Sequence, residues 1–282
     1  MSSIRNTIVK SKYHNKPILT DLFYKETNTK KPVVIFCHGY KGYKDWGAWN
    51  LAAEEFMKQD LFFVKFNFSH NGGTTENPID FPDLEAFGQN NFTLELDDLE
   101  TVINWLISNS DFENEADFEN ITLIGHSRGG GIVTLKAAEN NKISKVISWA
   151  GVSDFGARFP KDEKILQYWE KEGVSYIENA RTKQQMPHYF QFYTNFKENE
   201  ERLTIKNAVT NLSIPHLIIQ GELDDVVKTN EAENLHRWNP KSELIVVEGM
   251  NHPLGCTQPW TAAKMPVHLA EVVNYSVDFI KK

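Results

Sequence analysis

Short apolar runs alternate along this chain with segments in which apolar residues recur at helical spacing. The run at 33–37 is apolar throughout, which is typical of a strand buried on both faces of a sheet. In the segment 92–107, leucine, isoleucine and valine recur mostly every three or four residues, which predicts a helix. Such alternation predicts an α/β fold with a mostly parallel sheet between helices. Eight strands are expected at 4–9, 17–24, 33–37, 61–68, 121–124, 145–149, 216–220 and 243–247, the first two as an antiparallel edge hairpin, and helices at 46–59, 92–107, 127–139, 229–238 and 266–280.

Two stretches interrupt this alternation. Residues 69–91 contain so much glycine, proline and asparagine that we expect no regular structure, only a long functional or covering loop. Residues 155–211 contain many charges and aromatic side chains but no clear strand. We expect them to form a small helical cap, inserted after the sixth strand of a single domain spanning 1–282, since so short a piece can hardly bury a core of its own. The aromatic residues of this cap could either line a substrate pocket or pack the cap itself, and the sequence does not decide between these two roles.

Composition narrows the partners and the compartment. The formal net charge of −8 argues against nucleic acid or an anionic membrane as the main partner. The N-terminus lacks the apolar core of a signal peptide, and no apolar run approaches membrane-spanning length. Cys37 and Cys256 are too few for a disulfide framework, so a cytoplasmic protein is expected. The oligomeric state stays open, with a homodimer among the options.

The strand at 121–124 runs into the pentapeptide Gly125-His126-Ser127-Arg128-Gly129, which is followed by the helix at 127–139. A Gly-x-Ser-x-Gly motif between a strand and a helix is typical of a sharp turn that exposes a nucleophilic serine. Glycine is needed where the strand and the helix pass too close together for a Cβ atom. The alternative for Ser127 is an ordinary helix N-cap.

A serine hydroxyl needs a base, and the base needs a group that orients it. His252 lies in a loop just past the strand at 243–247, and Glu222, Asp224 and Asp225 crowd the turn after the strand at 216–220. The carboxyl ends of parallel strands meet at one edge of a sheet, where such proteins build their sites. We therefore expect Ser127, His252 and one of these acids to converge.

Acyl transfer also needs two backbone N–H groups that stabilise the developing oxyanion. Arg128, directly after the serine, is expected to supply one of them. The loop that begins His38-Gly39-Tyr40 after the strand at 33–37 is expected to supply the other, from Tyr40. His38 and His126 are expected to hold these two turns by packing and hydrogen bonding.

These motifs together resemble the α/β-hydrolase superfamily over nearly the whole chain. The matching elements are the strand followed by His38-Gly39-Tyr40, the serine pentapeptide, Gly221-x-x-Asp224-x-x-Val227 and Gly249-x-x-His252. The chain looks most similar to the serine esterases that include cinnamoyl and feruloyl esterases, with dienelactone-hydrolase-like and serine-aminopeptidase-like members close by.

The resemblance implies an acyl-enzyme mechanism without a cofactor or a metal ion. In it Ser127 is the nucleophile, His252 the general base and Asp224 the orienting carboxylate, with Asp225 and Asp154 as rival acids. Dienelactone hydrolases proper use a cysteine nucleophile, so the serine argues against their chemistry. The histidines outside these motifs show no metal-ligand spacing.

We expect a serine carboxylic-ester hydrolase whose partner is a small-molecule ester, with a small to medium acyl or aryl group, hydroxycinnamoyl included. A peptidase or thioesterase using the same triad, or a non-catalytic ligand-binding homologue, is the alternative. An aminopeptidase would need an acidic pocket for the free amine, which Glu163, Glu170 or Glu172 of the cap could supply.

Overall fold

Eight of the strands form one sheet in the order β1-β2-β4-β3-β5-β6-β9-β10, in a computed structural model that describes residues 2–282. β2 pairs antiparallel with both β1 and β4, and every other neighbouring pair is parallel. The predicted mostly parallel sheet with its N-terminal edge hairpin is therefore confirmed. The strands are β1 (Ser2–Lys10), β2 (Pro17–Tyr24), β3 (Lys31–Cys37), β4 (Phe62–Phe66), β5 (Ala116–His126), β6 (Ile143–Trp149), β9 (His216–Gly221) and β10 (Glu243–Val247).

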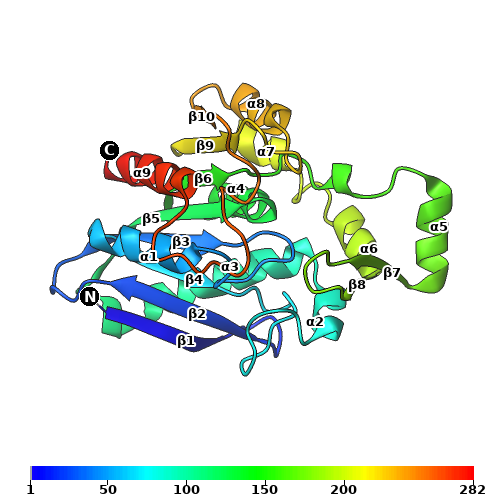
Figure 1. The fold of residues 1–282 in the computed structure, drawn as a ribbon, viewed down its shortest axis with the longest axis horizontal. Coiled ribbons are helices and arrows are strands. Elements are labelled where there is room, and N and C mark those ends of the chain that lie inside the picture. Colours follow the sequence, from blue (N-terminus) through cyan, green and yellow to red (C-terminus); the bar gives the residue numbers. More distant parts are fainter. Residues whose placement is uncertain (1) are drawn as a thin grey trace.

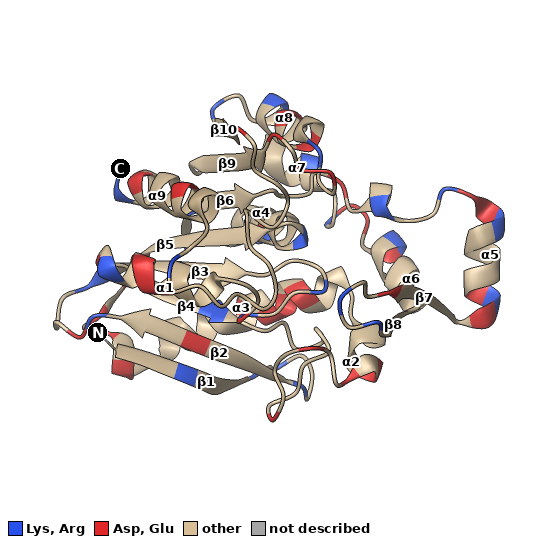
Figure 2. Cartoon of the chain, viewed as in Figure 1, with Lys and Arg blue, Asp and Glu red and all other residues tan. Residues whose placement is uncertain are grey.

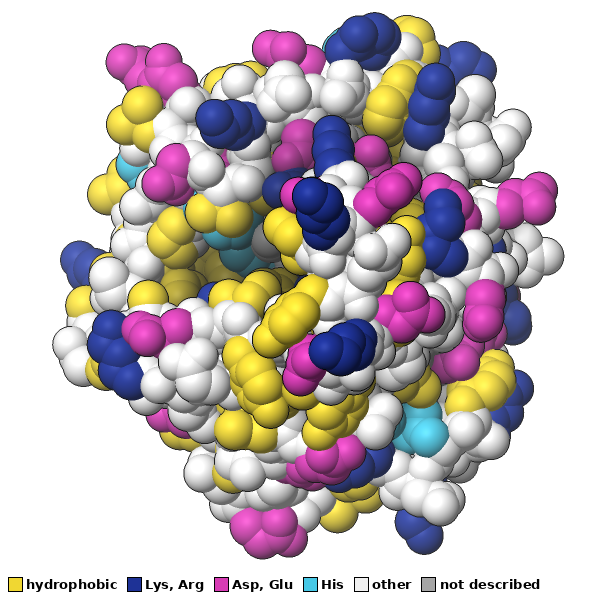
Figure 3. Space-filling model, turned by 90° about the vertical axis from the view of Figure 1, so that its right-hand side faces the viewer, with side chains coloured by type: hydrophobic (Ala, Val, Ile, Leu, Met, Phe, Trp, Pro, Cys, Tyr) yellow, Lys and Arg dark blue, Asp and Glu magenta, His cyan; other side chains and the backbone are white. Residues whose placement is uncertain are grey.

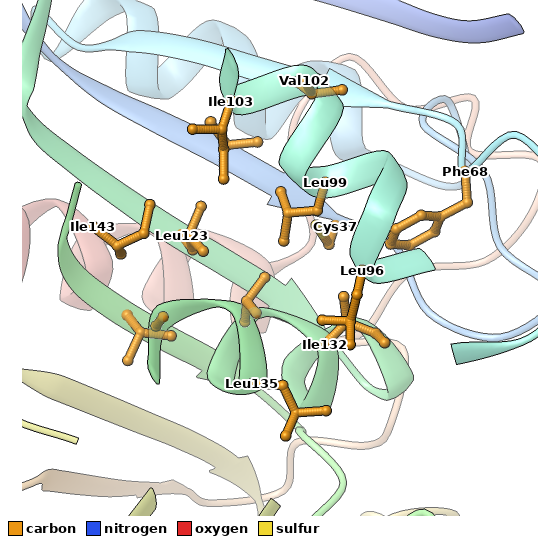
Figure 4. Packing of buried hydrophobic residues seen from close by; sticks show 14 of the residues in the cluster. Cys37, Phe68, Leu96, Leu99, Val102, Ile103, Leu123, Ile132, Leu135 and Ile143 are labelled. Carbon is orange, nitrogen blue, oxygen red and sulfur yellow. The ribbon is translucent and has the colours of Figure 1, made fainter. Parts of the chain in front are cut away.

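Helices cover both faces of this sheet (Figure 1). The side chains of β3 alternate between two hydrophobic clusters: Val34 and Phe36 pack with α1 and α9, whereas Val33 and Ile35 pack with α3, α4 and α8. Figure 4 shows part of the second cluster, where Leu99 of α3 lies beside Cys37. These helices are α1 (Trp49–Lys58), α3 (Phe92–Ser108), α4 (Arg128–Glu139), α8 (Thr229–Trp238) and α9 (Val267–Lys281), with a short 3-10 turn at Ser110–Phe112.

The insertion after the sixth strand, β6, lies beyond the carboxyl ends of the parallel strands (Figure 1). It is not purely helical, so the expectation that it holds no strand is wrong. β7 and β8 pair as an antiparallel hairpin. β7 is almost entirely exposed, so it has no buried face whose alternating pattern the sequence could show. The elements of the insertion are a 3-10 turn (Gly156–Arg158), α5 (Glu163–Glu172), β7 (Val174–Glu178), β8 (Gln185–Tyr189), α6 (Gln191–Glu198) and α7 (Ile205–Thr210).

The segment expected to lack regular structure contains one short helix, α2 (Leu84–Gln89). The carboxylate of Asp83 accepts a hydrogen bond from the Ala86 N–H and caps this helix. Ala86 and Phe87 are buried, and α2 packs against β8. This tertiary contact outweighs the loop-like composition, so the expectation is wrong for these residues.

Buried ions anchor the loop that follows β3. The Lys44 and Lys65 ammonium groups each lie 2.9 Å from Asp21 Oδ2, and Lys65 Nζ lies 2.6 Å from Asp45 Oδ1. Asp21 and Lys65 are fully buried within strands, where the sequence shows only a charged residue in an apolar run. Lys44 and Asp45 belong to the loop that begins with His38, so these ion pairs fasten that loop to β2 and β4.

We expect Asp21→Asn to lower the free energy of unfolding by about 3 kcal/mol, because it removes one of the two carboxylates, Asp21 and Asp45, that the buried Lys44 and Lys65 ammonium groups share. Burial alone would raise the pKa of Asp21, but Lys65 and Lys44 outweigh it, so the pKa of Asp21 is lowered. The stabilisation from this carboxylate is therefore complete at neutral pH and is lost in acid, as the pH falls through the folded-state pKa. Urea unfolding measures both effects. Asp60→Asn, which removes an exposed partner of Lys25, should cost at most about 1 kcal/mol; equal losses in the two variants would contradict the account.

Candidate active site

Ser127 sits on a strained turn between β5 and α4. Its φ is 57° and its ψ −119°, a conformation that a residue with a Cβ adopts only when its surroundings impose it. The side chain makes no capping hydrogen bond to α4. Its Oγ instead lies 3.0 Å from Nε2 of His252. The turn therefore presents the hydroxyl to an imidazole, which the helix N-cap alternative does not explain.

The two outer glycines of the pentapeptide make this turn sterically feasible. A Cβ on Gly125 would lie 2.1 Å from the carbonyl oxygen of Gly129, and one on Gly129 would lie 2.4 Å from that of Cys37. No other residue fits at either position without moving backbone atoms.

His252 bridges the serine and one carboxylate. Its Nδ1 donates to Oδ2 of Asp224 at 2.8 Å, which leaves Nε2 to accept from the Ser127 hydroxyl. Asp224 follows β9 and His252 follows β10, so both reach the site from the carboxyl ends of neighbouring strands. The structure thus brings together the three side chains that the sequence singled out.

The rival acids have other contacts. Glu222 accepts a hydrogen bond from the Gly249 N–H, and Asp154 accepts one from the Ala157 N–H. Asp225 is exposed to solvent. Asp224 is the acid that contacts His252.

The surroundings of Asp224 keep it ionised. Burial would raise the pKa of this carboxyl, but the hydrogen bond and charge of His252 and the backbone N–H groups of Val226 and Val227 outweigh burial and hold the pKa below its usual value. Oδ1 accepts those two N–H groups at 2.9 and 2.8 Å. The side-chain amide of Gln220 also donates to Oδ2, at 3.1 Å. The carboxylate is therefore fixed before substrate binds.

His126 and His38 hold the turns around the serine, as expected. His126 Nε2 donates to the backbone carbonyl of His252 at 2.9 Å, and His38 Nδ1 donates to that of Gly39 at 2.9 Å. His38 Nε2 accepts from the Phe68 N–H at 3.3 Å. Burial lowers the pKa of His126 to about 3 and that of His38 to about 4. Both imidazoles are therefore neutral and act as fixed hydrogen-bonding groups.

The loop after β3 lies directly against the serine. A Cβ on Gly39 would lie 2.9 Å from the Cβ of Ser127. Within residues 2–282, the backbone N–H groups of Tyr40 and Arg128 have no protein acceptor. Both residues line the same cavity as Ser127. Two residues that line this cavity with the serine therefore have backbone N–H groups without a protein partner in the described range.

Tyr40 also connects this loop to the cap, through a residue that the sequence did not point out. Burial raises the pKa of Tyr40 to about 12 and lowers that of His188 to about 4, so both groups are neutral. The Tyr40 hydroxyl lies 2.9 Å from Nε2 of His188, at the end of β8. The hairpin of the cap thereby holds the ring of a residue that lines the same cavity as Ser127.

The side chain of Arg128 is held by contacts with two other residues. Nη1 donates to Oε1 of the buried Glu95 at 3.2 Å, and the guanidinium carbon lies 4.4 Å from the centre of the Tyr40 ring. Burial raises the pKa of Glu95 despite the charge of Arg128. Glu95 is on α3, so its contact with the start of α4 could not be foreseen from local pattern.

Ser127 lines two cavities of different character. One, of about 350 Å³, lies under the cap and is lined mainly by apolar side chains. The other, of about 300 Å³, lies beside the loop after β3 and is lined by more polar side chains. Figure 3 shows the cap-bearing face hollowed, with hydrophobic side chains around the hollow and histidine on its floor. Several cap aromatics line the first cavity (Phe155, Phe159, Trp169 and Phe192), and the same residues belong to the core cluster, so they both form the pocket and pack the cap.

No Asp or Glu is among the described residues that line either cavity. Glu163, Glu170 and Glu172 are exposed on α5, and Figure 2 shows that helix at the side of the cap farthest from the sheet, with charged residues near both of its ends. The acidic amine-binding pocket that an aminopeptidase would need is therefore not formed by these residues.

Within residues 2–282, no three His, Cys, Asp or Glu side chains are grouped so that they could hold a metal ion. None of the helices in that range is both long and apolar enough to cross a membrane.

Comparison with known proteins places these features in context. A family model for the alpha/beta hydrolase fold matches residues 87–255, which is more than half of the chain and includes Ser127, Asp224 and His252. The chain is 23% identical over 280 residues to monoacylglycerol lipase ABHD6 of Rattus norvegicus, covering 86% of this chain and 77% of the relative.

Solved structures share the fold at lower identity. Est1E from Butyrivibrio proteoclasticus with bound ferulic acid superposes with a TM-score of 0.72 at 15% identity, over 98% of both chains. Dienelactone hydrolase from Anabaena variabilis superposes with a TM-score of 0.63 at 15% identity, over 99% of this chain and 97% of that one.

Proposed function

Because this chain belongs to the alpha/beta hydrolase fold family, we propose that it is a serine carboxylic-ester hydrolase that works through an acyl-enzyme. The observation that carries the proposal is the continuous contact from Ser127 Oγ through the His252 imidazole to the Asp224 carboxylate. An alcohol so placed can lose its proton to the imidazole as it attacks a carbonyl carbon.

In the proposed reaction, each step is assigned to one of these groups. Ser127 attacks the ester carbonyl while His252 takes its proton, and the amides of Tyr40 and Arg128 receive the oxyanion. His252 returns the proton to the leaving alcohol, which departs and leaves the acyl group on the serine. His252 next activates a water molecule, whose attack releases the acid and restores the enzyme. Asp224 orients the imidazole and stabilises its charged form throughout.

The cavity under the cap supports acyl or aryl groups of small to medium size. Its volume of about 350 Å³ and its aromatic lining suit a short aliphatic chain or a single ring, hydroxycinnamoyl groups included. A relative named as a monoacylglycerol lipase and a structural neighbour that holds ferulic acid agree with an ester of this kind. We propose a small-molecule ester as the partner and the cytoplasm as the place of action, since the two cysteines are free.

A substrate panel tests the reaction class. We expect turnover of p-nitrophenyl acetate and butyrate, and no turnover of alanine or leucine p-nitroanilide above the uncatalysed rate, because no lining carboxylate is available for a free amine. Release of nitroaniline, or hydrolysis of a butyryl thioester without hydrolysis of the oxygen esters, would replace the proposal with the corresponding class. Absence of turnover with every member would indicate a non-catalytic homologue.

A further inference from the structure

The two cavities that meet at Ser127 give the substrate a direction. Ser127 and Tyr40 line both of them, so an ester bound at the serine extends one side into each. His252 lines the polar cavity and is not among the residues that line the apolar one. The leaving oxygen must lie near His252 Nε2 to receive its proton. The alcohol portion therefore occupies the polar cavity, and the acyl portion occupies the apolar cavity under the cap.

The polar cavity is lined by two cationic side chains and, among the described residues, by no anionic one. Lys41 belongs to the loop after β3, and Arg181 to the turn between β7 and β8. This cationic lining contrasts with the chain as a whole, whose formal net charge is −8. The side-chain amides of Asn179 and Gln258 also line this cavity, together with apolar side chains such as Trp46 and Trp49.

The two cations differ in how they are neutralised. The Arg181 guanidinium pairs with Asp80. Lys41 has no carboxylate within ion-pair distance in residues 2–282, and its ammonium lies 5.2 Å from the centre of the Tyr40 ring. Its side chain is half-buried, and burial lowers the pKa of Lys41. An anion bound in this cavity would give the Lys41 ammonium the ion-pair partner that it lacks among the described residues.

We propose that the alcohol released by this enzyme carries an anionic group, as a hydroxy acid or a phosphorylated alcohol does, and that Lys41 binds it with Arg181 alongside. The inference rests on the proposed ester hydrolysis and names its substrate class. In the reaction, water enters, the bond between the acyl carbon and the alcohol oxygen breaks, and the products are an apolar carboxylic acid and an anionic alcohol.

A matched set of butyryl esters tests this. Butyryl glycolate carries a carboxylate, butyryl glycolamide is its neutral isostere, and butyryl 2-hydroxyethyl phosphate carries a phosphate. The measured quantity is the ratio of kcat/KM for each anionic ester to that for the neutral one. We expect this ratio to fall about tenfold in Lys41→Met, since a charge-assisted contact is lost, and to be retained in Lys41→Arg. Whichever anionic ester has the higher ratio in the wild type identifies the source of the charge.

Two controls make the result specific. Lys30→Met removes the same charge from an exposed site directly before β3. This site lies at the amino end of the strand, opposite to the active site, so the variant should leave the ratio unchanged. Arg181→Met should lower the ratio too, which covers the case that Lys41→Met does not fold. If p-nitrophenyl butyrate is hydrolysed but the ratio is the same in wild type, Lys41→Met and Arg181→Met, the inference of an anionic alcohol is overturned while the proposed ester hydrolysis stands. If the wild type hydrolyses no ester, the proposed function fails with it.

Discussion

Ser127→Ala should lower kcat for p-nitrophenyl butyrate on the order of a millionfold, because it removes the atom to which the acyl group would bond. The residual rate would come from the amides of Tyr40 and Arg128 and from substrate binding alone. The variant should remain folded, since the serine hydroxyl contacts His252 and does not cap α4. Steady-state kinetics with a folding check by circular dichroism measures this.

Ser242→Ala is the matched control. Ser242 is also buried and its hydroxyl also contacts an imidazole, at 2.9 Å from Nδ1 of His236, but it lies between α8 and β10, away from the two cavities. Its kcat should stay close to that of the wild type. Similar activity in wild type and Ser127→Ala would refute the role of the serine.

Asp224→Asn should lower kcat about ten-thousandfold with little change in volume. The Val226 and Val227 N–H groups would keep the amide oxygen in the place of Oδ1, so the amide NH2 would face Nδ1 of His252 and donate to it. The ring is then held in the wrong tautomer, and its positive form loses the stabilising carboxylate. The pKa of Asp224 is held low, so this carboxylate stays ionised on the acid side of neutrality and its own protonation should not limit wild-type activity there. Activity measured from pH 5 to 8 checks both statements.

Asp225→Asn and Asp154→Asn test whether the loss of kcat in Asp224→Asn comes from the lost contact with His252 or only from the loss of a negative charge. Neither carboxylate touches His252: Asp225 is exposed, and Asp154 caps the turn at Ala157. Both variants should keep kcat within a fewfold of the wild type. Loss of activity in either one, with Asp224→Asn unaffected, would move the acid to the other position.

The body of the fold was predictable because its strands are apolar runs and its helices have regular spacing. The run at 33–37 reads as doubly buried, and the structure divides its side chains between two cores as that pattern requires. The positions of Ser127, Asp224 and His252 followed from the same reasoning, since each lies at or shortly beyond the carboxyl end of a parallel strand. The α/β-hydrolase fold that the motifs implied is confirmed.

The cap and the supports of the site were less predictable. The hairpin of β7 and β8 depends on contacts with α2 and with Tyr40, and not on a buried face of its own. The contact of Arg128 with Glu95 and that of Lys65 with Asp21 join residues 33 and 44 positions apart. No local pattern marks such pairs, because a charge in a helix or strand reads as solvent-facing until its partner is known.

Lys41 shows the same limit at the site itself. In the sequence it is one residue of the loop His38-Gly39-Tyr40-Lys41-Gly42, where glycine and tyrosine carry the argument. Its left-handed backbone and its place on the wall of the polar cavity appear only in three dimensions.

Covalent labelling of the nucleophile tests the central claim most directly. The intact protein is treated with a fluorophosphonate, and peptide mass spectrometry locates the adduct. The account predicts one phosphonyl group per chain, on Ser127, with labelling slowed strongly in Asp224→Asn. An adduct on another residue, or a wild-type protein that stays unlabelled while it hydrolyses p-nitrophenyl butyrate, would contradict it.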